Sequence, residues 1–190
     1  RIRGLVGIRA ASGDAGRVWC PGRGGGAGGG GGGGGVWSIF SVCTYIRETG
    51  DYAFLDEKVP YVDGGEGTVR EHLMRGLDFT RENVGAHGIP RFLLSDWNDS
   101  ICAISDGGKA ESAFVFFQAA HAAYELKLLF AHMDDKENLA WAEDYYNWCK
   151  DKYEILWDGK WFLRAFLGNG EKFGTDEDEY NKIFLNPQSW

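Results

Sequence analysis

The chain is predicted to fold as an all-α protein, part of an α/α barrel with one short β-hairpin. Two of its segments, 36–49 and 111–133, carry apolar residues on nearly every face of a helix. Two others, from 68 to about 84 and from 136 to about 153, carry a single apolar stripe. A helix that is apolar all round must be enclosed by protein, whereas a one-sided helix faces water. The alternation of the two kinds predicts an inner and an outer ring of helices.

The first enclosed helix and the first one-sided helix have clear boundaries in the sequence. Gly50 follows the enclosed helix and is typical of a residue just past a helix end. Thr68 and Glu71 form a T-x-x-E capping box, which predicts that a helix begins there and runs to about Val84. Its buried stripe is expected at Val69, Leu73, Leu77 and Thr80 or Val84.

The second pair repeats the pattern and leads into the hairpin. The enclosed helix is expected from Glu111 to about Met133, and Asp134 or Asp135 is expected to cap the next one. That one-sided helix has its stripe at Leu139, Ala142, Tyr146, Cys149 and Tyr153. Asp158-Gly159 then favours a type I′ turn between two short aromatic strands.

The chain divides into a poorly defined segment, 1–35, and a partial barrel domain, 36–190. Residues 24–35 are eleven glycines and Ala27, a composition that encodes no side-chain contacts. We interpret this run as standing in for residues whose side chains were never assigned. It has no G-x-x-x-x-G-K-[ST] pattern, so it does not predict a phosphate-binding loop. We also interpret both ends, Arg1 and Trp190, as cut rather than finished.

The overall charge narrows the class of partner. A formal net charge of −8, from 28 acidic and 20 basic side chains, disfavours nucleic acid and anionic membranes as partners.

With no charged-then-apolar leader and no apolar run near roughly 18 residues, we expect a cytoplasmic protein. The scattered cysteines predict neither a disulfide framework nor a zinc site. The histidines also lack metal-ligand spacing, with His72 expected on an exposed helix face and His87 in a turn.

One short motif has the side chains of carbohydrate chemistry. Asp96, Trp97, Asn98 and Asp99 follow the apolar run 92–94. A carboxyl group can donate a proton, an amide can hydrogen-bond sugar hydroxyls, and an indole offers a flat apolar face to a pyranose ring. The same residues could instead form an ordinary polar turn with Trp97 in the core.

Several ordered segments together resemble glycoside hydrolase family 94, the inverting disaccharide phosphorylases. The match includes His87-Gly88-Ile89-Pro90 before the D-W-N-D motif, Gly108-Lys109-Ala110-Glu111-Ser112 after it, and the segments 157–165 and 184–190. Segments 45–51 and 63–69 are also similar to that family. The resemblance implies an (α/α)6 barrel.

The resemblance also implies roles for individual residues. Asp99 is expected to be the general acid, and Trp97 to line the donor-sugar subsite. Asp96 is the competing candidate for the acid, but we favour a role for Asp96 and Asn98 in holding the loop. Glu111 is a candidate for substrate binding, although the helix dipole alone could favour a carboxylate there. Inorganic phosphate is the co-substrate, with no cofactor or metal.

The predicted function is inverting phosphorolysis of a β-linked glucose-type disaccharide or oligosaccharide, which gives a sugar 1-phosphate. The alternatives are a hydrolytic α/α-barrel glycosidase and a noncatalytic carbohydrate-binding fragment. The family's donor-binding Arg and Asp would fall in the glycine run, and its phosphate ligands lie beyond Trp190. We therefore expect this fragment to be inactive alone. The family tends to form dimers, so a homodimer is an open expectation, and the sequence does not identify the disaccharide.

Overall fold

The computed structural model describes residues 35–61, 64–93, 96 and 98–190, with the side chains of residues 99 and 100 excepted. Expectations for segment 1–34 and most of the glycine run lie outside these residues. The described helices are α2 (Trp37–Thr49), α3 (Val69–Glu82), α4 (Ala113–His132), α5 (Lys136–Lys150) and α6 (Leu185–Ser189), with the 3₁₀ helices η1 (Tyr52–Asp56), η2 (Asp99–Ser105) and η3 (Tyr153–Leu156). Helix dominates the regular structure, which confirms the main part of the expected fold class.

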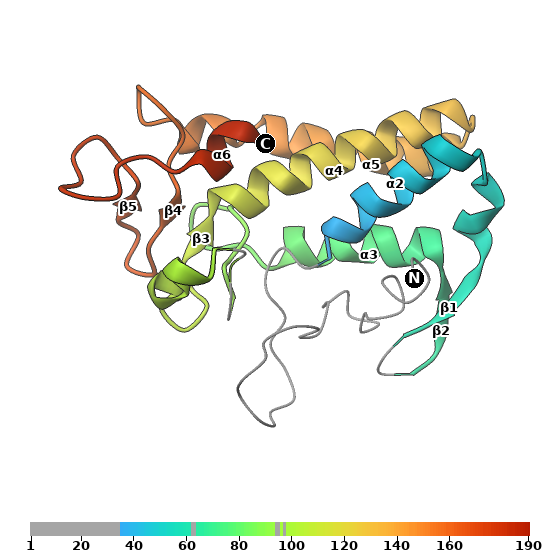
Figure 1. Ribbon diagram of the computed structural model, residues 1–190, viewed down its shortest axis with the longest axis horizontal. Helices are drawn as coiled ribbons and strands as arrows, with labels where there is room; N and C mark the ends of the chain where they lie inside the picture. The colour runs from blue at the N-terminus through green and yellow to red at the C-terminus, as the bar shows by residue number, and fades with distance from the viewer. Residues whose placement is uncertain (1–34, 62–63, 94–95, 97) are drawn as a thin grey trace.

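Helix α4 is the centre of the helical array. It contacts α2, α3 and α5, and Figure 1 shows α4 and α5 running side by side along the array. The buried residues of α4 include Phe116, Ala119, Ala123, Leu126 and Phe130. The expectation of an enclosed helix in 111–133 is therefore confirmed for most of α4, but not for Tyr124 and Leu128, which are 40% and 47% exposed. The barrel to which these helices would contribute stays a prediction.

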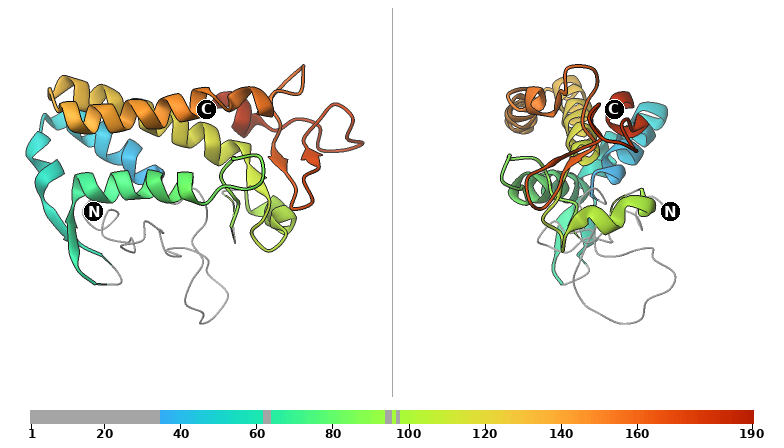
Figure 2. Two further views of the ribbon diagram at one scale, coloured as in Figure 1. Left: turned by 180° about the vertical axis from the view of Figure 1, so that it is seen from behind. Right: turned by 90° about the vertical axis from the view of Figure 1, so that its left-hand side faces the viewer.

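Two small antiparallel sheets lie at opposite ends of the array (Figures 1 and 2). Strand β1 (Lys58–Pro60) pairs with β2 (Glu66–Thr68) at the end where α3 begins. At the other end, β4 (Ala165–Phe166) pairs with β3 (Glu111–Ser112) on one side and β5 (Lys172–Phe173) on the other. The second sheet therefore brings the start of α4 beside a segment about 50 residues further along the chain.

The capping predictions are confirmed. The Thr68 hydroxyl accepts from the Glu71 backbone N–H, and the Glu71 carboxylate accepts from the Thr68 backbone N–H at 2.6 Å. Gly50 has φ +70°, the left-handed conformation that glycine adopts without strain. Asp135 caps α5 by accepting from the Asn138 backbone N–H. Helix ends that depend on such local signals are therefore readable from sequence.

The expectation that His72 lies on an exposed helix face is wrong. Its side chain is fully buried, and its Nε2 lies 3.0 Å from the Val59 carbonyl oxygen. The imidazole also stacks on Tyr61, with 4.1 Å between ring centroids. The buried face of α3 is wider than its apolar stripe because the β1 segment covers a polar residue next to that stripe.

The structure differs from expectation at Glu111, in α5 and in the hairpin. Glu111 is not helical, because it lies in β3 and α4 begins two residues later, with Ser112 as its N-cap. Helix α5 ends at Lys150, and its buried tyrosine is Tyr145 rather than Tyr146. In the expected hairpin only a single bridge, Trp157 to Phe162, forms.

The hairpin turn is also shifted by one residue. The Asp158 N–H donates to the Trp161 carbonyl at 2.9 Å, so Gly159 and Lys160 are the central residues. Gly159 has φ +93°, but Lys160 does not have a positive φ, so the turn lacks the second positive-φ residue that type I′ requires. Of the helices described, none combines the length and the apolar character needed to cross a bilayer.

Candidate active-site loop

The candidate site lies in the connection between α3 and α4, at the end of the array that carries β3. This connection folds back along the chain that leads into α4. The Phe92 N–H donates to the Ala110 carbonyl at 2.7 Å, and the Ser112 N–H donates to the Pro90 carbonyl at 2.7 Å. These bonds extend the β3 pairing into segment 90–92, and Asp96 contacts β3 through Ser112.

Glu111 fastens the turn at 85–89, which precedes the motif. Its carboxylate accepts from the backbone N–H groups of His87 and Ile89, at 3.1 and 3.0 Å, and lies 2.6 Å from His87 Nδ1. The His87 ring stacks on Phe166, with centroids 3.8 Å apart. The Glu111 side chain is 3% exposed, so its acceptors are used within the protein. Its predicted contact with substrate stays a prediction beside this observed role.

Asp96 forms a fully buried ion pair with Arg164, a residue 68 positions further along the chain. Arg164 Nη2 donates to Asp96 Oδ1, and Arg164 Nη1 donates to the Ser112 hydroxyl at 3.1 Å. The Ser112 hydroxyl in turn donates to Asp96 Oδ2 at 3.1 Å. The three side chains form a closed polar ring, in which each carboxylate oxygen has a donor.

Aromatic rings surround the guanidinium of this pair. Arg164 Cζ lies 5.2, 5.7 and 6.0 Å from the ring centroids of Phe92, Phe114 and Phe184. Burial lowers the pKa of the Arg164 guanidinium, and the Asp96 charge opposes that shift. An arginine retains its proton in such a site. Asp96 and Arg164 are therefore a compensated pair of charges in an apolar setting.

Asp96 also fixes the backbone that leads to Asp99. Its Oδ1 accepts from the Asn98 N–H at 2.9 Å, and the Asn98 carbonyl accepts from the Ile101 N–H at 3.0 Å. The Asp96 N–H donates to Cys102 Sγ at 3.4 Å. Helix η2 begins at Asp99, immediately after this local network. The loop-holding role that we favoured for Asp96 thus has a geometric basis.

Two of the remaining predicted site residues, Trp97 and Asp99, have no described side-chain geometry. Trp97 lies outside the described residues, and Asp99 is described only in its backbone, so the acid and subsite roles stay predictions. The Asn98 side chain is half-buried. A neighbouring carboxylate is one of the causes that raise the pKa of a general acid. Because Arg164 compensates the Asp96 charge, we expect little contribution of this kind from Asp96.

Arg164 and Ser112 are the residues of this site that sequence reasoning missed. No side-chain partner was predicted for Arg164, yet its side chain has no exposed surface. A usable signal was present, since Arg164 lies within the apolar run 161–166, where a charged side chain without an internal partner would be costly. Its partner could not be identified from sequence because the pairing is long-range.

A separate apolar groove lies away from this loop. A groove of about 510 Å³ runs between α4 and α5 and is lined by Phe116, Phe117, Ala120, His121, Tyr124, Tyr146, Cys149, Lys150, Tyr153 and Trp190. None of the polar-ring residues contributes to it. In the described part of the chain, no group of three or more His, Cys, Asp or Glu side chains is arranged to hold a metal ion.

Comparison with known proteins gives one consistent family. The family described as "Glycosyl hydrolase 94 superfamily, catalytic domain" matches residues 23–190. Solabiose phosphorylase of Paenibacillus borealis is 37% identical over 166 residues, which cover 82% of this chain and 20% of that protein. N,N′-diacetylchitobiose phosphorylase of Vibrio furnissii is 36% identical over 153 residues, covering 79% and 19%. Cellobionic acid phosphorylase of Neurospora crassa is 31% identical over 156 residues, covering 82% and 20%. The chain thus spans about a fifth of the length of these relatives.

Proposed function

Since this chain belongs to the glycosyl hydrolase 94 superfamily, we propose that the full-length protein cleaves a β-linked disaccharide or oligosaccharide by inverting phosphorolysis. The observation that carries the proposal is the match over residues 23–190, together with three similar proteins that are all phosphorylases of disaccharides or related sugars. The D-W-N-D loop lies within the matched region. The buried ion pair between Asp96 and Arg164 holds this loop. A catalytic loop must be held in one conformation, and such a contact supports it.

The reaction needs one proton donor and one nucleophile. A lone pair of phosphate attacks the anomeric carbon from the face opposite the leaving group, and the bond from that carbon to the interglycosidic oxygen breaks. The oxygen keeps the bonding electrons and takes the proton of Asp99. The products are a sugar 1-phosphate of inverted configuration and the released sugar. Because phosphate is already anionic, the reaction does not need the second carboxylate that an inverting hydrolase uses to activate water.

Each predicted residue has a defined part in this scheme. Asp99 is the general acid and must be protonated before the reaction, which requires a raised pKa in the complete site. Trp97 packs against the donor sugar ring. Asp96 and Asn98 hold the loop, with Asp96 buried in its ion pair, and Glu111 supports the neighbouring turn. The donor and phosphate sites are completed by parts of the protein beyond the described residues.

The test is phosphate-dependent turnover by the full-length protein. We would supply cellobiose, solabiose, N,N′-diacetylchitobiose and cellobionic acid in turn, with and without phosphate, and measure sugar 1-phosphate. Asp99→Asn is expected to lower kcat by about 10²–10⁴-fold, since that is the usual contribution of general acid catalysis. Asp144→Asn makes the same chemical change on the exposed face of α5 and should leave kcat unchanged.

Two results would contradict the proposal. Release of free sugar at the same rate without phosphate would identify a hydrolase. Sugar binding with no turnover on any substrate would favour the noncatalytic reading. A mild effect of Asp99→Asn in an active enzyme would leave the reaction standing but assign the acid to another residue.

A further inference from the structure

We propose that Arg164 is a positioning residue for the general acid, and that it acts through Asp96 and Ser112. The inference rests on the proposed function, because it assumes that Asp99 donates the proton. Its basis is the closed polar ring of Arg164, Asp96 and Ser112, which joins the residue before β4, the loop before η2 and the N-cap of α4. None of these residues needs to touch the substrate for the effect to occur.

The backbone at Arg164 is the rigid side of this arrangement. Its N–H donates to the Phe173 carbonyl at 2.9 Å, and its carbonyl accepts from the Ala113 N–H at 3.2 Å. Arg164 thus continues the pairing of the β3–β4–β5 sheet on both sides. Gly174 packs closely against it, since a Cβ at Gly174 would lie 2.9 Å from the Arg164 backbone nitrogen. The guanidinium therefore projects from a fixed point.

The path from Arg164 to Asp99 is short and continuous. Arg164 Nη2 and the Asn98 N–H donate to the same oxygen, Asp96 Oδ1, and η2 begins at the next residue, Asp99. If the Asp96 carboxylate moves, the Asn98 N–H loses its hydrogen-bond acceptor, and the backbone at the start of η2 is no longer held in place. A small displacement of a catalytic group lowers the rate far more than it lowers binding, since reacting atoms must meet within a narrow geometry.

The geometry of the guanidinium matters here, in addition to its charge. Arg164 reaches Asp96 with one terminal nitrogen and Ser112 with the other, which a planar group with fixed donors can do. A lysine keeps the positive charge that Asp96 needs but has a single nitrogen. Arg164→Lys therefore separates charge compensation from placement.

A purely structural role would also reduce activity, so the test must distinguish misplacement from loss of folded protein. The leaving group provides that distinction. A β-glycosyl fluoride releases fluoride, which needs much less protonation than a sugar alkoxide. A misplaced acid slows phosphorolysis of the disaccharide and spares that of the fluoride, whereas a smaller folded fraction slows both by the same factor.

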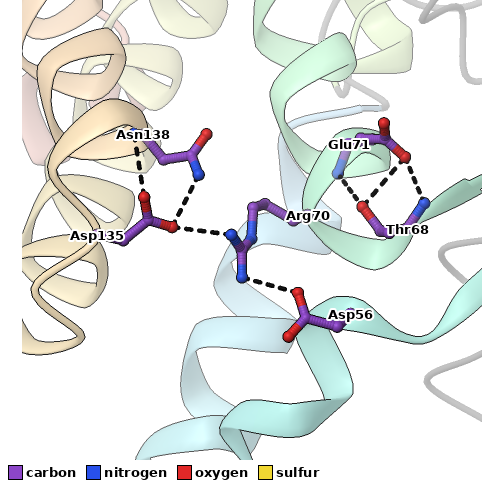
Figure 3. A network of polar contacts seen from close by, with 6 residues as sticks. All are labelled: Asp56, Thr68, Arg70, Glu71, Asp135 and Asn138. Atoms are coloured by element: carbon purple, nitrogen blue, oxygen red, sulfur yellow. Dashed lines mark hydrogen bonds and ion pairs between the residues drawn. The ribbon is translucent and has the colours of Figure 1, made fainter.

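We would measure kcat and KM with phosphate for both substrates in the full-length enzyme. Asp99→Asn is the reference, and Arg164→Lys is the test. For Arg164→Lys we expect about a 10²-fold loss of kcat on the disaccharide, a nearly unchanged KM, and a much smaller loss on the fluoride. The matched control is Arg70→Lys at the opposite end of the array, where Arg70 also donates to two partners, Asp56 and Asp135 (Figure 3). It should affect both substrates equally or not at all.

If Arg164→Lys does not fold, the double variant D96N/R164M replaces the ion pair with neutral groups of similar size. The same selective loss in a folded double variant would support the inference. Equal losses on both substrates, or full activity, in either variant would overturn it. If Asp99→Asn itself shows no selective loss, the acid assignment fails first, and that result differs from a failure confined to Arg164.

Discussion

The Glu111 side chain occupies the space that a side chain at Gly85 would fill. A Cβ atom at Gly85 would lie 2.4 Å from Glu111 Cδ and 2.8 Å from its Oε1. Close packing therefore requires glycine at position 85. The turn that contains Gly85 directs the His87 and Ile89 N–H groups at the Glu111 carboxylate. One missing methyl group thus permits a buried carboxylate to lie against three donors.

We predict that Gly85→Ala destabilises the full-length protein by about 1–3 kcal/mol, the usual result of overpacking. Equilibrium urea unfolding would measure it. The control is a double-mutant cycle with Glu111→Ala, in which the loss caused by Gly85→Ala should shrink because the clashing side chain is gone. An equal loss in both backgrounds would show that the two residues do not compete for the same space.

The capping box of α3 makes a pH-dependent contribution to stability. The backbone hydrogen bond from Thr68 is the main cause that lowers the pKa of Glu71, and burial partly opposes it. A group whose pKa is lower in the folded state contributes stability above its unfolded pKa, and this contribution is lost as the pH falls through the folded pKa.

We therefore expect Glu71→Gln to be less stable than the parent protein at pH 7, and we expect the difference to shrink as the pH falls below the ordinary glutamate pKa of about 4.5. Urea unfolding over that range would measure the difference. Glu82→Gln, an exposed residue in the last turn of the same helix, should show no such loss at pH 7, because a negative charge there opposes the helix dipole. A Glu71→Gln difference that does not change with pH would contradict the assigned cause.

Two buried thiols should be chemically inert in the folded protein. Burial raises the pKa of Cys43 and of Cys149 to about 12 each, so little thiolate is present at pH 8. Iodoacetamide at pH 8 should modify half-buried Cys102 before either of them, and mass spectrometry of the peptides would show the order. Urea should make Cys43 and Cys149 reactive. Modification of Cys43 as fast as Cys102 without denaturant would contradict the expected burial.

The same shift has a consequence at alkaline pH. The folded state retains these two thiol protons while the unfolded state loses them from about pH 8.5. Stability should therefore fall as the pH rises from that value toward 12. Cys43→Ala or Cys149→Ala should make the fall less steep.

Features determined by neighbouring residues could be predicted from sequence, and features determined by distant ones could not. Thr68, Glu71 and Gly50 act within one turn of a helix, and each was identified correctly. His72 was misassigned because the segment that buries it includes Val59 of β1. The spacing of apolar residues along α3 carries no information about where that strand lies. Glu111 was placed in the helix because the apolar run continues through it, whereas pairing with Phe166 holds it in a strand.

The candidate site divides in the same way. The D-W-N-D motif was recognisable because four adjacent residues carry it. The Asp96 partner was not, since Arg164 is distant in sequence and only the β3–β4 pairing brings it near Ser112. A buried charge in an apolar run indicates that a partner exists. It does not indicate which one.

Arg70 joins three elements at the end of the array opposite the candidate site. Its Nη1 lies 2.8 Å from Asp135 Oδ2 and its Nη2 lies 2.8 Å from Asp56 Oδ1 (Figure 3). Asp135 is also the N-cap of α5, so its carboxylate serves two helices at once. The Asp135 and Arg70 side chains are only 17% and 22% exposed, whereas Asp56 is 68% exposed. The pair with Asp135 should therefore be the stronger one.

We predict that Arg70→Met lowers the free energy of unfolding by about 1–2 kcal/mol, since it leaves a partly buried carboxylate without its cation. Urea unfolding of Arg70→Met, Asp135→Asn and the double variant should give a coupling energy of about 1 kcal/mol. The corresponding cycle with Asp56→Asn should give less than half of that, because solvent already screens the Asp56 charge. Equal coupling in both cycles would mean that exposure does not decide the strength of these pairs. The catalytic constants for both leaving groups should keep the same ratio in all of these variants.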